Sequence, residues 1–303
     1  MTETLPAEPG YLRHFEACNR FDASHFLAFN IGDAQFGWVR PDLADVLESQ
    51  IGSFQRSADS LTLNVKYPKY ATRSMALADA ADLLVEYAGT KLSGEMKPVM
   101  QKWGDTPVAQ VDIGVMHLFG LKVFGVNLNG WTVKDGKTHM WLAKRAGDLY
   151  SHPNKLDVVA AGGISTAVNR MATLADEAKQ EANIPESLTK QSDFGGAIDF
   201  TCERRGGVRS EVDFSYDLKL PGDFVPKNLD GEVANFQLWP IERVAELVRT
   251  TNDIKYNCNM VITSFLVRHG FIDEQHPEFE ALRAYLEPHR EDRTSPDLPA
   301  LRR

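Results

Sequence analysis

One stretch of the sequence, residues 162–184, joins a Gly-Gly pair to a predicted amphipathic helix that carries two acidic residues. Glu177 and Glu181 are four residues apart, so a helix presents both carboxylates on one face. Two carboxylates held in this way can bind one hard cation such as magnesium and leave positions for water and a phosphate. The stretch therefore predicts a turn followed by a helix, and with them a site suited to cutting a diphosphate bond.

The same pattern has a simpler explanation. A helix with a solvated charged face would also show these acids, with Met171, Leu174 and Ala178 packed on the opposite side. The helix alone does not separate the two explanations, and the surrounding sequence favours the first.

The stretch resembles the Nudix box, the signature of hydrolases that cleave nucleoside diphosphates linked to another moiety. Starting from Gly162, Glu177 and Glu181 fall on two acidic positions of the box, and Ile184 falls on its last aliphatic position. Four positions depart from the family pattern: Val168 stands for Glu, Asp176 for Arg, Gln180 for Glu and Asn183 for Gly.

These departures have different consequences. The resemblance implies that Val168 and Asp176 replace a Glu and an Arg that pair with each other, so their joint replacement leaves no buried charge unpaired. Asn183 can adopt the left-handed conformation that a helix-ending Gly supplies. Gln180 puts a neutral amide where the family has an anionic metal ligand or base, which predicts weaker metal binding and a slower reaction.

The flanking sequence predicts a sheet around this helix. Strands are expected over 122–130 and 138–143, joined by a tight turn at Asp135 and Gly136, and then over 195–203, 211–218 and 236–239. A helix opened by Pro240 follows. A hairpin, a loop, a helix, further strands and a proline-initiated helix is the order of a Nudix fold, so the resemblance implies an α-β-α sandwich of the α+β class.

The length of 303 residues predicts two units with separate cores. We place an N-terminal α+β domain at 1–115, a Nudix domain at 116–285 and a disordered tail, rich in proline and charge, at 286–303. Further elements are predicted from periodicity: helices over 12–19, 41–47, 74–87 (capped by Ser74) and 257–268, a hairpin over 25–39, a strand over 61–67 and a linker over 107–117.

Several short segments are similar to one Nudix subgroup. Its members carry an N-terminal extension related to the one attached to thiamine pyrophosphokinase in some fungi. The matching segments are residues 26–29 and 37–39 in the extension, and 155–157, 216–218, 224–226, 230–233 and 238–240 in the Nudix part. The subgroup implies hydrolysis of thiamine diphosphate analogues, including oxidised forms, to the monophosphate.

The candidate site residues form three groups. Glu177, Glu181 and the backbone carbonyl of the Gly162 region are the expected ligands of Mg²⁺ or Mn²⁺, with Glu181 also assigned to catalysis. Glu232, in a loop ahead of a strand, is the candidate base, because Gln180 cannot accept a proton at neutral pH. Glu203 and Glu211 flank a predicted hairpin turn, where one of them could reach the same cation or simply face solvent.

The third group is basic. Lys144, Arg145 and Lys155 lie between the first hairpin and the box, where they could donate charge-assisted hydrogen bonds to phosphates or form a solvated surface cluster. His152, next to Pro153, is expected to be a loop residue rather than a ligand.

Composition restricts the partners. A formal net charge of −9 opposes general binding to nucleic acids or anionic membranes, and the chain shows no apolar run of membrane-spanning length and no N-terminal signal pattern. Three cysteines without metal-ligand spacing predict reduced thiols and a cytoplasmic location. The expected partner is a small-molecule diphosphate, and the sequence does not determine the oligomeric state.

Two other functions remain open. Gln180 favours a Nudix-fold module that binds a diphosphate ligand without cutting it, whereas Glu177 and Glu181 favour catalysis. A purely structural or interaction role is the third possibility.

Overall fold

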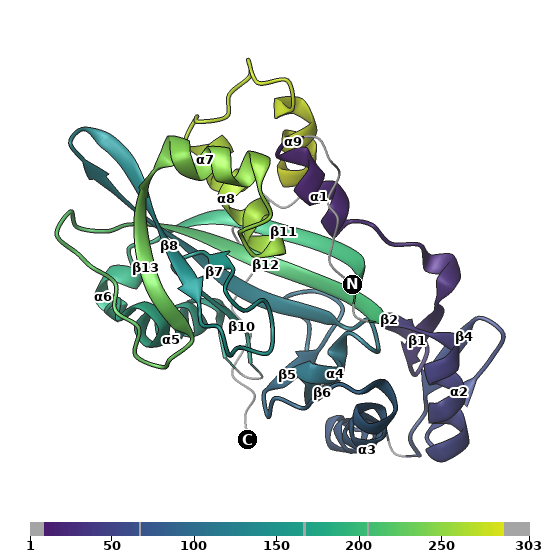
Figure 1. Ribbon diagram of the computed structural model, residues 1–303. Helices are drawn as coiled ribbons and strands as arrows, with labels where there is room; N and C mark the ends of the chain where they lie inside the picture. Colours follow the sequence, from purple (N-terminus) through teal and green to yellow (C-terminus); the bar gives the residue numbers. More distant parts are fainter. Residues whose placement is uncertain (1–8, 67, 166–167, 205, 288–303) are drawn as a thin grey trace.

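Figure 1 shows the chain as a computed structural model that describes residues 9–66, 68–165, 168–204 and 206–287. Within the N-terminal part, a four-stranded sheet has the order β2 (Ala34–Val39), β1 (Leu27–Ile31), β4 (Ser60–Leu63), β3 (Phe54–Arg56). Helices α2 (Pro41–Gln50) and α3 (Tyr70–Ala88) pack their apolar residues into the same core. The predicted hairpin and the proline-initiated helix are confirmed.

Two details of this part differ from expectation. Helix α3 begins at Tyr70, because Thr72 Oγ1 accepts the Lys69 N–H at 3.1 Å and so caps the first turn; Ser74 lies inside the helix and donates to the carbonyl of Tyr70 at 2.8 Å. The predicted linker over 107–117 is largely regular structure. It forms β6 (Ala109–Asp112), which pairs with β5 (Met96–Val99), and then α4 (Ile113–Met116).

A larger sheet organises the C-terminal part. Its main path is β11 (Asp193–Arg204), β12 (Gly207–Lys219), β7 (Lys122–Lys134), β8 (Lys137–Arg145), β13 (Val233–Pro240), and two short strands, β9 (Leu156–Asp157) and β10 (Ala160–Gly163), pair with β8 and β7. The turn between β7 and β8 places Asp135 at φ 52° and Gly136 at φ 73°, two left-handed residues in a row, as the sequence predicts.

Helices cover both faces of this sheet (Figure 1). On one side lie α5 (Arg170–Ala182) and α6 (Glu186–Thr189); Leu174 and Ala178 of α5 share a buried cluster with Val126 and Leu128 of β7. On the other side lie α7 (Ile241–Thr250) and α8 (Tyr256–Arg268), beside α1 (Leu12–Cys18) and α9 (Phe279–Leu286). The expected α-β-α sandwich is confirmed.

The two parts share the start of the chain and a short junction. Helix α1 packs in the cluster of α8 and α9, and the short 3-10 helix η1 (Ala23–His25) leads from it to β1. The N-terminal core draws its residues from 27–123. A boundary near residue 115 stays a prediction. Of the predicted tail, residue 286 ends α9, and residues 288–303 lie outside the described residues.

The junction, residues 117–120, runs between a strand of each part. Phe119 accepts the N–H of Trp38 in β2 at 2.8 Å, and His117 accepts the N–H of Val208 in β12 at 2.8 Å. Gly37 lets β2 come this close, because a Cβ at Gly37 would lie 2.2 Å from the Phe119 carbonyl oxygen. Both facing groups are backbone, so neither can move aside easily.

We therefore expect Gly37→Ala to destabilise the protein by about 1–3 kcal/mol through overpacking. Chemical denaturation followed by circular dichroism measures the change. Gly52→Ala is the control, because a Cβ at Gly52 meets no atom within 4 Å. Equal midpoints for Gly37→Ala and the control would show that the junction is not tightly packed.

The helices and the cysteines are also subjects of the sequence predictions. No helix within the described ranges has the length and apolarity to span a membrane. The thiols of Cys18, Cys202 and Cys258 are buried, and none forms a disulfide within the described part of the chain.

Candidate active site

A cavity of about 740 Å³ lies against the box helix α5 and is lined by residues of both parts of the chain. This volume is typical of a small-molecule site. Acidic and basic side chains line it together: Glu95, Glu177, Glu211, Asp213 and Glu232 with Lys91, Arg145, Arg204, Arg209 and Lys255. The mixture suits a ligand that carries both phosphate groups and a cation.

Local capping fixes the box helix beside this cavity. The Asn169 side chain accepts the Ala172 N–H at 2.7 Å at its start. Asn183 ends the helix at φ 53°, so the left-handed role predicted for this residue is confirmed. The loop before β13 is tied to the end of the helix, because Leu229 donates its N–H to Gln180 at 2.9 Å. This loop carries Glu232 to the cavity.

The two box glycines form the end of strand β10 rather than a turn. Neither has a positive φ, so backbone conformation does not explain them. Close approach does: a Cβ on Gly162 would lie 2.0 Å from Glu177 Oε1, and a Cβ on Gly163 would lie 3.0 Å from Lys97 Cε. The glycine pair makes room for one acidic and one basic side chain.

Glu177 is half-buried and lines the cavity. Burial, followed by the charge of Glu232, raises the pKa of the Glu177 carboxyl to about 7. The pKa of Glu232 is also raised, first by burial and then by Asp230. The Glu232 carboxylate therefore opposes the ionisation of Glu177, which is an electrostatic setting that a bound cation would relieve.

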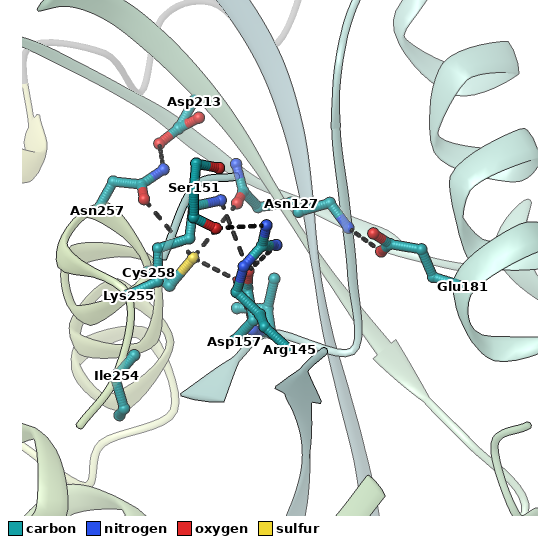
Figure 2. Close-up of polar contacts among 12 residues, drawn as sticks. Asn127, Arg145, Ser151, Asp157, Glu181, Asp213, Ile254, Lys255, Asn257 and Cys258 are labelled. Carbon is teal, nitrogen blue, oxygen red and sulfur yellow. Dashed lines mark hydrogen bonds and ion pairs between the residues drawn. The ribbon is translucent and has the colours of Figure 1, made fainter. Parts of the chain in front are cut away.

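Glu181 is 6% exposed and is not part of the cavity wall as described. Its Oε2 accepts the Ala161 N–H at 2.8 Å, which ties the box helix to strand β10 (Figure 2). Burial raises the pKa of this carboxyl well above its ordinary value. Of the two box acids that the sequence assigns to the cation, only Glu177 therefore lines the cavity.

Only one of the three predicted phosphate-binding residues lines the cavity. Arg145 lines the cavity, pairs with Asp157 at 3.2 Å, donates to the Ser151 carbonyl at 3.1 Å, and leaves its buried Nε without a partner among the described residues. Lys144, next on the strand, and Lys155, whose Nζ donates to the Asn252 carbonyl at 2.5 Å, do not line it. The structure brings only Arg145 to the site.

The remaining candidates from the sequence also differ in whether they line the cavity. Glu211 lines the cavity and forms an ion pair with Arg209 at 2.8 Å. Glu203 does not line the cavity, and its carboxylate lies 3.5 Å from the ring of His25. Gln180 is exposed and does not line the cavity. His152, expected to be an ordinary loop residue, lines the cavity with its ring centroid 5.2 Å from that of Tyr256.

A buried polar network joins the start of α8 to strands β9 and β12 (Figure 2). Cys258 donates to Asp157 at 2.7 Å, Lys255 pairs with Asp157 at 3.5 Å, and Asn257 donates to Asp213 at 2.8 Å. Burial alone would raise the pKa of Asp157, but Lys255 and Arg145 outweigh it and hold that pKa below its usual value. Asp157 therefore stays ionised and orients both cations.

Sequence reasoning missed the acid at the other end of this network. Burial and then Glu211 raise the pKa of Asp213 to about 7. The signal was present in β12, where Glu211, Asp213, Ser215 and Asp217 alternate with apolar residues although both faces are buried. Alternation in a two-sided buried strand indicates a polar function for one face. Glu95 and Lys97 carry no such signal. They lie in the N-terminal part, and local sequence does not reveal that this part approaches the box.

The donor set fits a magnesium-type ion only if the ligand takes part. Among the described residues, no group of three or more His, Cys, Asp or Glu side chains is arranged to hold a metal ion. Mg²⁺ in phosphate-transfer sites typically uses one or two carboxylates, with water and substrate phosphates in the remaining positions. Glu177 lines the cavity beside Gly162 and matches that smaller set, which leaves Glu232 free for another role.

The approach of Glu177 to strand β10 gives a prediction. If the site performs the diphosphate hydrolysis that the sequence resemblance implies, Gly162→Ala should lower its rate about 10²-fold. The new Cβ would displace the carboxylate, and small displacements at a reacting centre have effects of that size. The displaced atoms end a flexible side chain, so thermal stability should change little. Steady-state kinetics test this against Gly222→Ala, whose Cβ meets nothing within 4 Å. A wild-type rate in Gly162→Ala would remove Glu177 from the site.

Comparison with known proteins identifies the family of this chain. Residues 10–123 match a protein family described as a domain of unknown function, DUF4743. The chain is 31% identical over 275 residues to Nudix hydrolase 20, chloroplastic, of Arabidopsis thaliana, covering 87% of this chain and 74% of the relative. It is also 31% identical over 279 residues to Nudix hydrolase 24, chloroplastic, of the same plant, covering 89% and 75%.

Solved structures give a weaker likeness. A Caenorhabditis elegans Ap4A hydrolase binary complex matches 50% of this chain and 99% of its own, at 16% identity and a TM-score of 0.37. The classification rests instead on the plant relatives, which match across both parts of the chain. On that similarity, the chain belongs to the Nudix hydrolase family.

Proposed function

We propose that this chain is a divalent-cation-dependent hydrolase of a small-molecule diphosphate, acting in the cavity beside α5. The observation that carries the proposal is that Glu177 and Glu232 both line this cavity, each with a raised pKa. Carboxyls with raised pKa values in one cavity are typical of functional sites, and a cation bound there would offset their negative charge.

Each residue has a role in the proposal. Glu177, with the backbone of Gly162, holds Mg²⁺ or Mn²⁺. When bound, this ion neutralises charge on the diphosphate oxygens and lowers the pKa of water. Glu232 accepts the proton of the attacking water. Arg145, which lines the cavity, donates to a phosphate oxygen. Glu181 does not touch the ion in this proposal; it holds strand β10 in place by accepting the Ala161 N–H.

Thiamine diphosphate and its oxidised analogues are the proposed substrates. The support is the resemblance of segments 26–29, 37–39 and 230–233 to the subgroup described above. The cavity adds compatible chemistry: Tyr256 and His152 offer aromatic faces, and Glu211 and Asp213 offer negative charge to a cationic ring.

The test is metal-dependent phosphate release from a panel of diphosphates that includes thiamine diphosphate, its oxidised derivatives and ADP-ribose. The proposal expects release that requires Mg²⁺ or Mn²⁺ and is fastest with a thiamine compound. Fast release from ADP-ribose alone would keep the hydrolase and reject the substrate class. Tight calorimetric binding of a diphosphate without turnover would instead select the binding module that Gln180 favours.

A further inference from the structure

The N-terminal domain contributes directly to the cavity. Residues 88–93, Glu95 and part of the segment 113–118 line it together with Glu177 of the box helix. Residues 10–123 match a family described as a domain of unknown function, and this wall places part of that segment at the cavity. The residue of most interest lies just behind the wall.

Lys97, on β5, is a lysine with only 3% of its side chain exposed. Burying an ammonium group is costly unless acceptors surround it. Its Nζ donates to the Gly163 carbonyl at 2.7 Å and to Ser165 Oγ at 3.3 Å, and it pairs with Glu95 at 2.9 Å. These three acceptors use all three N–H groups of the ammonium, so Lys97 has none left for a substrate phosphate.

A second, independent observation concerns Gly163. This residue has no positive φ, and the three atoms nearest to a Cβ there would be Lys97 Cε at 3.0 Å, Lys97 Nζ at 3.1 Å and Ile113 Cδ1 at 3.6 Å. Both Lys97 and Ile113 belong to the N-terminal domain. The absence of a side chain at the second glycine of the box therefore leaves room for a lysine from the N-terminal domain.

We propose that the N-terminal domain completes the active site through Lys97, a positioning residue that fixes the strand end at residues 162–165. This inference rests on the proposed function. The first residue of this strand end, Gly162, packs against Glu177, and the Ile164 N–H is bonded to the Phe124 carbonyl at 2.7 Å. Lys97 supplies the anchor on the side that β7 does not reach. Without it, the strand end and the Glu177 carboxylate beside it lose their fixed relation to the cation.

The test compares Lys97→Met, which keeps the apolar stem and removes the ammonium, with Lys102→Met, an exposed lysine of the same domain. Hydrogen exchange on the full chain should show faster exchange at residues 161–165 in Lys97→Met and no change in the control. The Mn²⁺ concentration for half-maximal hydrolysis should rise about 10-fold or more, as for other supports of metal ligands. The substrate KM at saturating Mn²⁺ should change less, which a simple loss of folded protein would not produce.

The outcomes separate this inference from the proposed function. Unchanged exchange at residues 161–165 overturns the inference, and so does faster exchange with an unaltered Mn²⁺ requirement. If wild type hydrolyses nothing on the panel but binds Mn²⁺ in calorimetry, the proposed function fails, and the loss of Mn²⁺ affinity in Lys97→Met still decides the inference. If wild type neither hydrolyses nor binds Mn²⁺, both fail.

Discussion

Glu177→Gln should abolish most metal-dependent hydrolysis, by about 10³-fold, while making the metal-free protein more stable at pH 8. The loss of rate follows from removing the charge that holds the cation, an effect of the size seen when one electrostatic partner of a transition state is removed. Steady-state phosphate release measures it. Asp176→Asn, an exposed acid on the same helix, is the matched control and should keep the wild-type rate.

The gain in stability follows from the raised pKa. The folded-state pKa of Glu177 is about 7 and the reference value is 4.5, so its protonated form favours folding. That contribution is complete below about pH 4.5 and is lost as the pH rises to about 7. At pH 8 the amide variant avoids the penalty, which we expect to be roughly 2 kcal/mol after solvent screening.

Thermal melts at pH 4.5 and pH 8, without metal, check this effect. The difference between Glu177→Gln and wild type should grow from the lower to the higher pH, and Mn²⁺ should narrow it by stabilising wild type alone. A difference that is the same at both pH values would mean that Glu177 ionises freely and that the cavity is not electrostatically strained.

Glu232→Gln should lower kcat by about 10²–10⁴-fold, the range for a lost general base, with little change in KM. The amide keeps the size of the side chain but cannot accept the proton of water. Wild-type kcat should rise with pH as Glu232 ionises, because its pKa lies above the usual value, and this limb should disappear in the variant. A pH–rate profile at saturating Mn²⁺ measures both.

The control for this variant is Asp223→Asn, an exposed acid in the same connection between β12 and β13. It should keep both the rate and the pH dependence of wild type. If Glu232→Gln retains the pH limb, another group is the base, and the buried acid Asp213 would be the next to test.

The Nudix part of the fold could be predicted because its signals are local. Asp135 and Gly136 specify a left-handed turn, Pro240 precedes a helix, and Asn183 ends one; each acts within a few residues. The same reasoning failed at Ser74, where Thr72 offered a better cap two residues earlier. Over 107–117, the strand depends on pairing with β5, which local sequence does not reveal.

The site could be predicted only in part, for a related reason. Glu177 and Glu232 are signalled by the box and by a loop that precedes a strand. Lys144 and Arg145 look equivalent in sequence, but strand alternation sends only Arg145 into the cavity. Lys97 is invisible from sequence, because it reaches Gly163 across 66 positions of the chain. Residues contributed by a second domain require the three-dimensional arrangement.

The central claim is that a divalent cation binds in this cavity against Glu177. Anomalous diffraction from crystals of the full chain, soaked with Mn²⁺ and a non-hydrolysable diphosphate, tests it most directly. We predict a manganese peak in contact with the Glu177 carboxylate and a phosphate oxygen, absent from Glu177→Gln crystals treated in the same way. Manganese elsewhere on the chain, with Glu177 contacting none, would contradict the account.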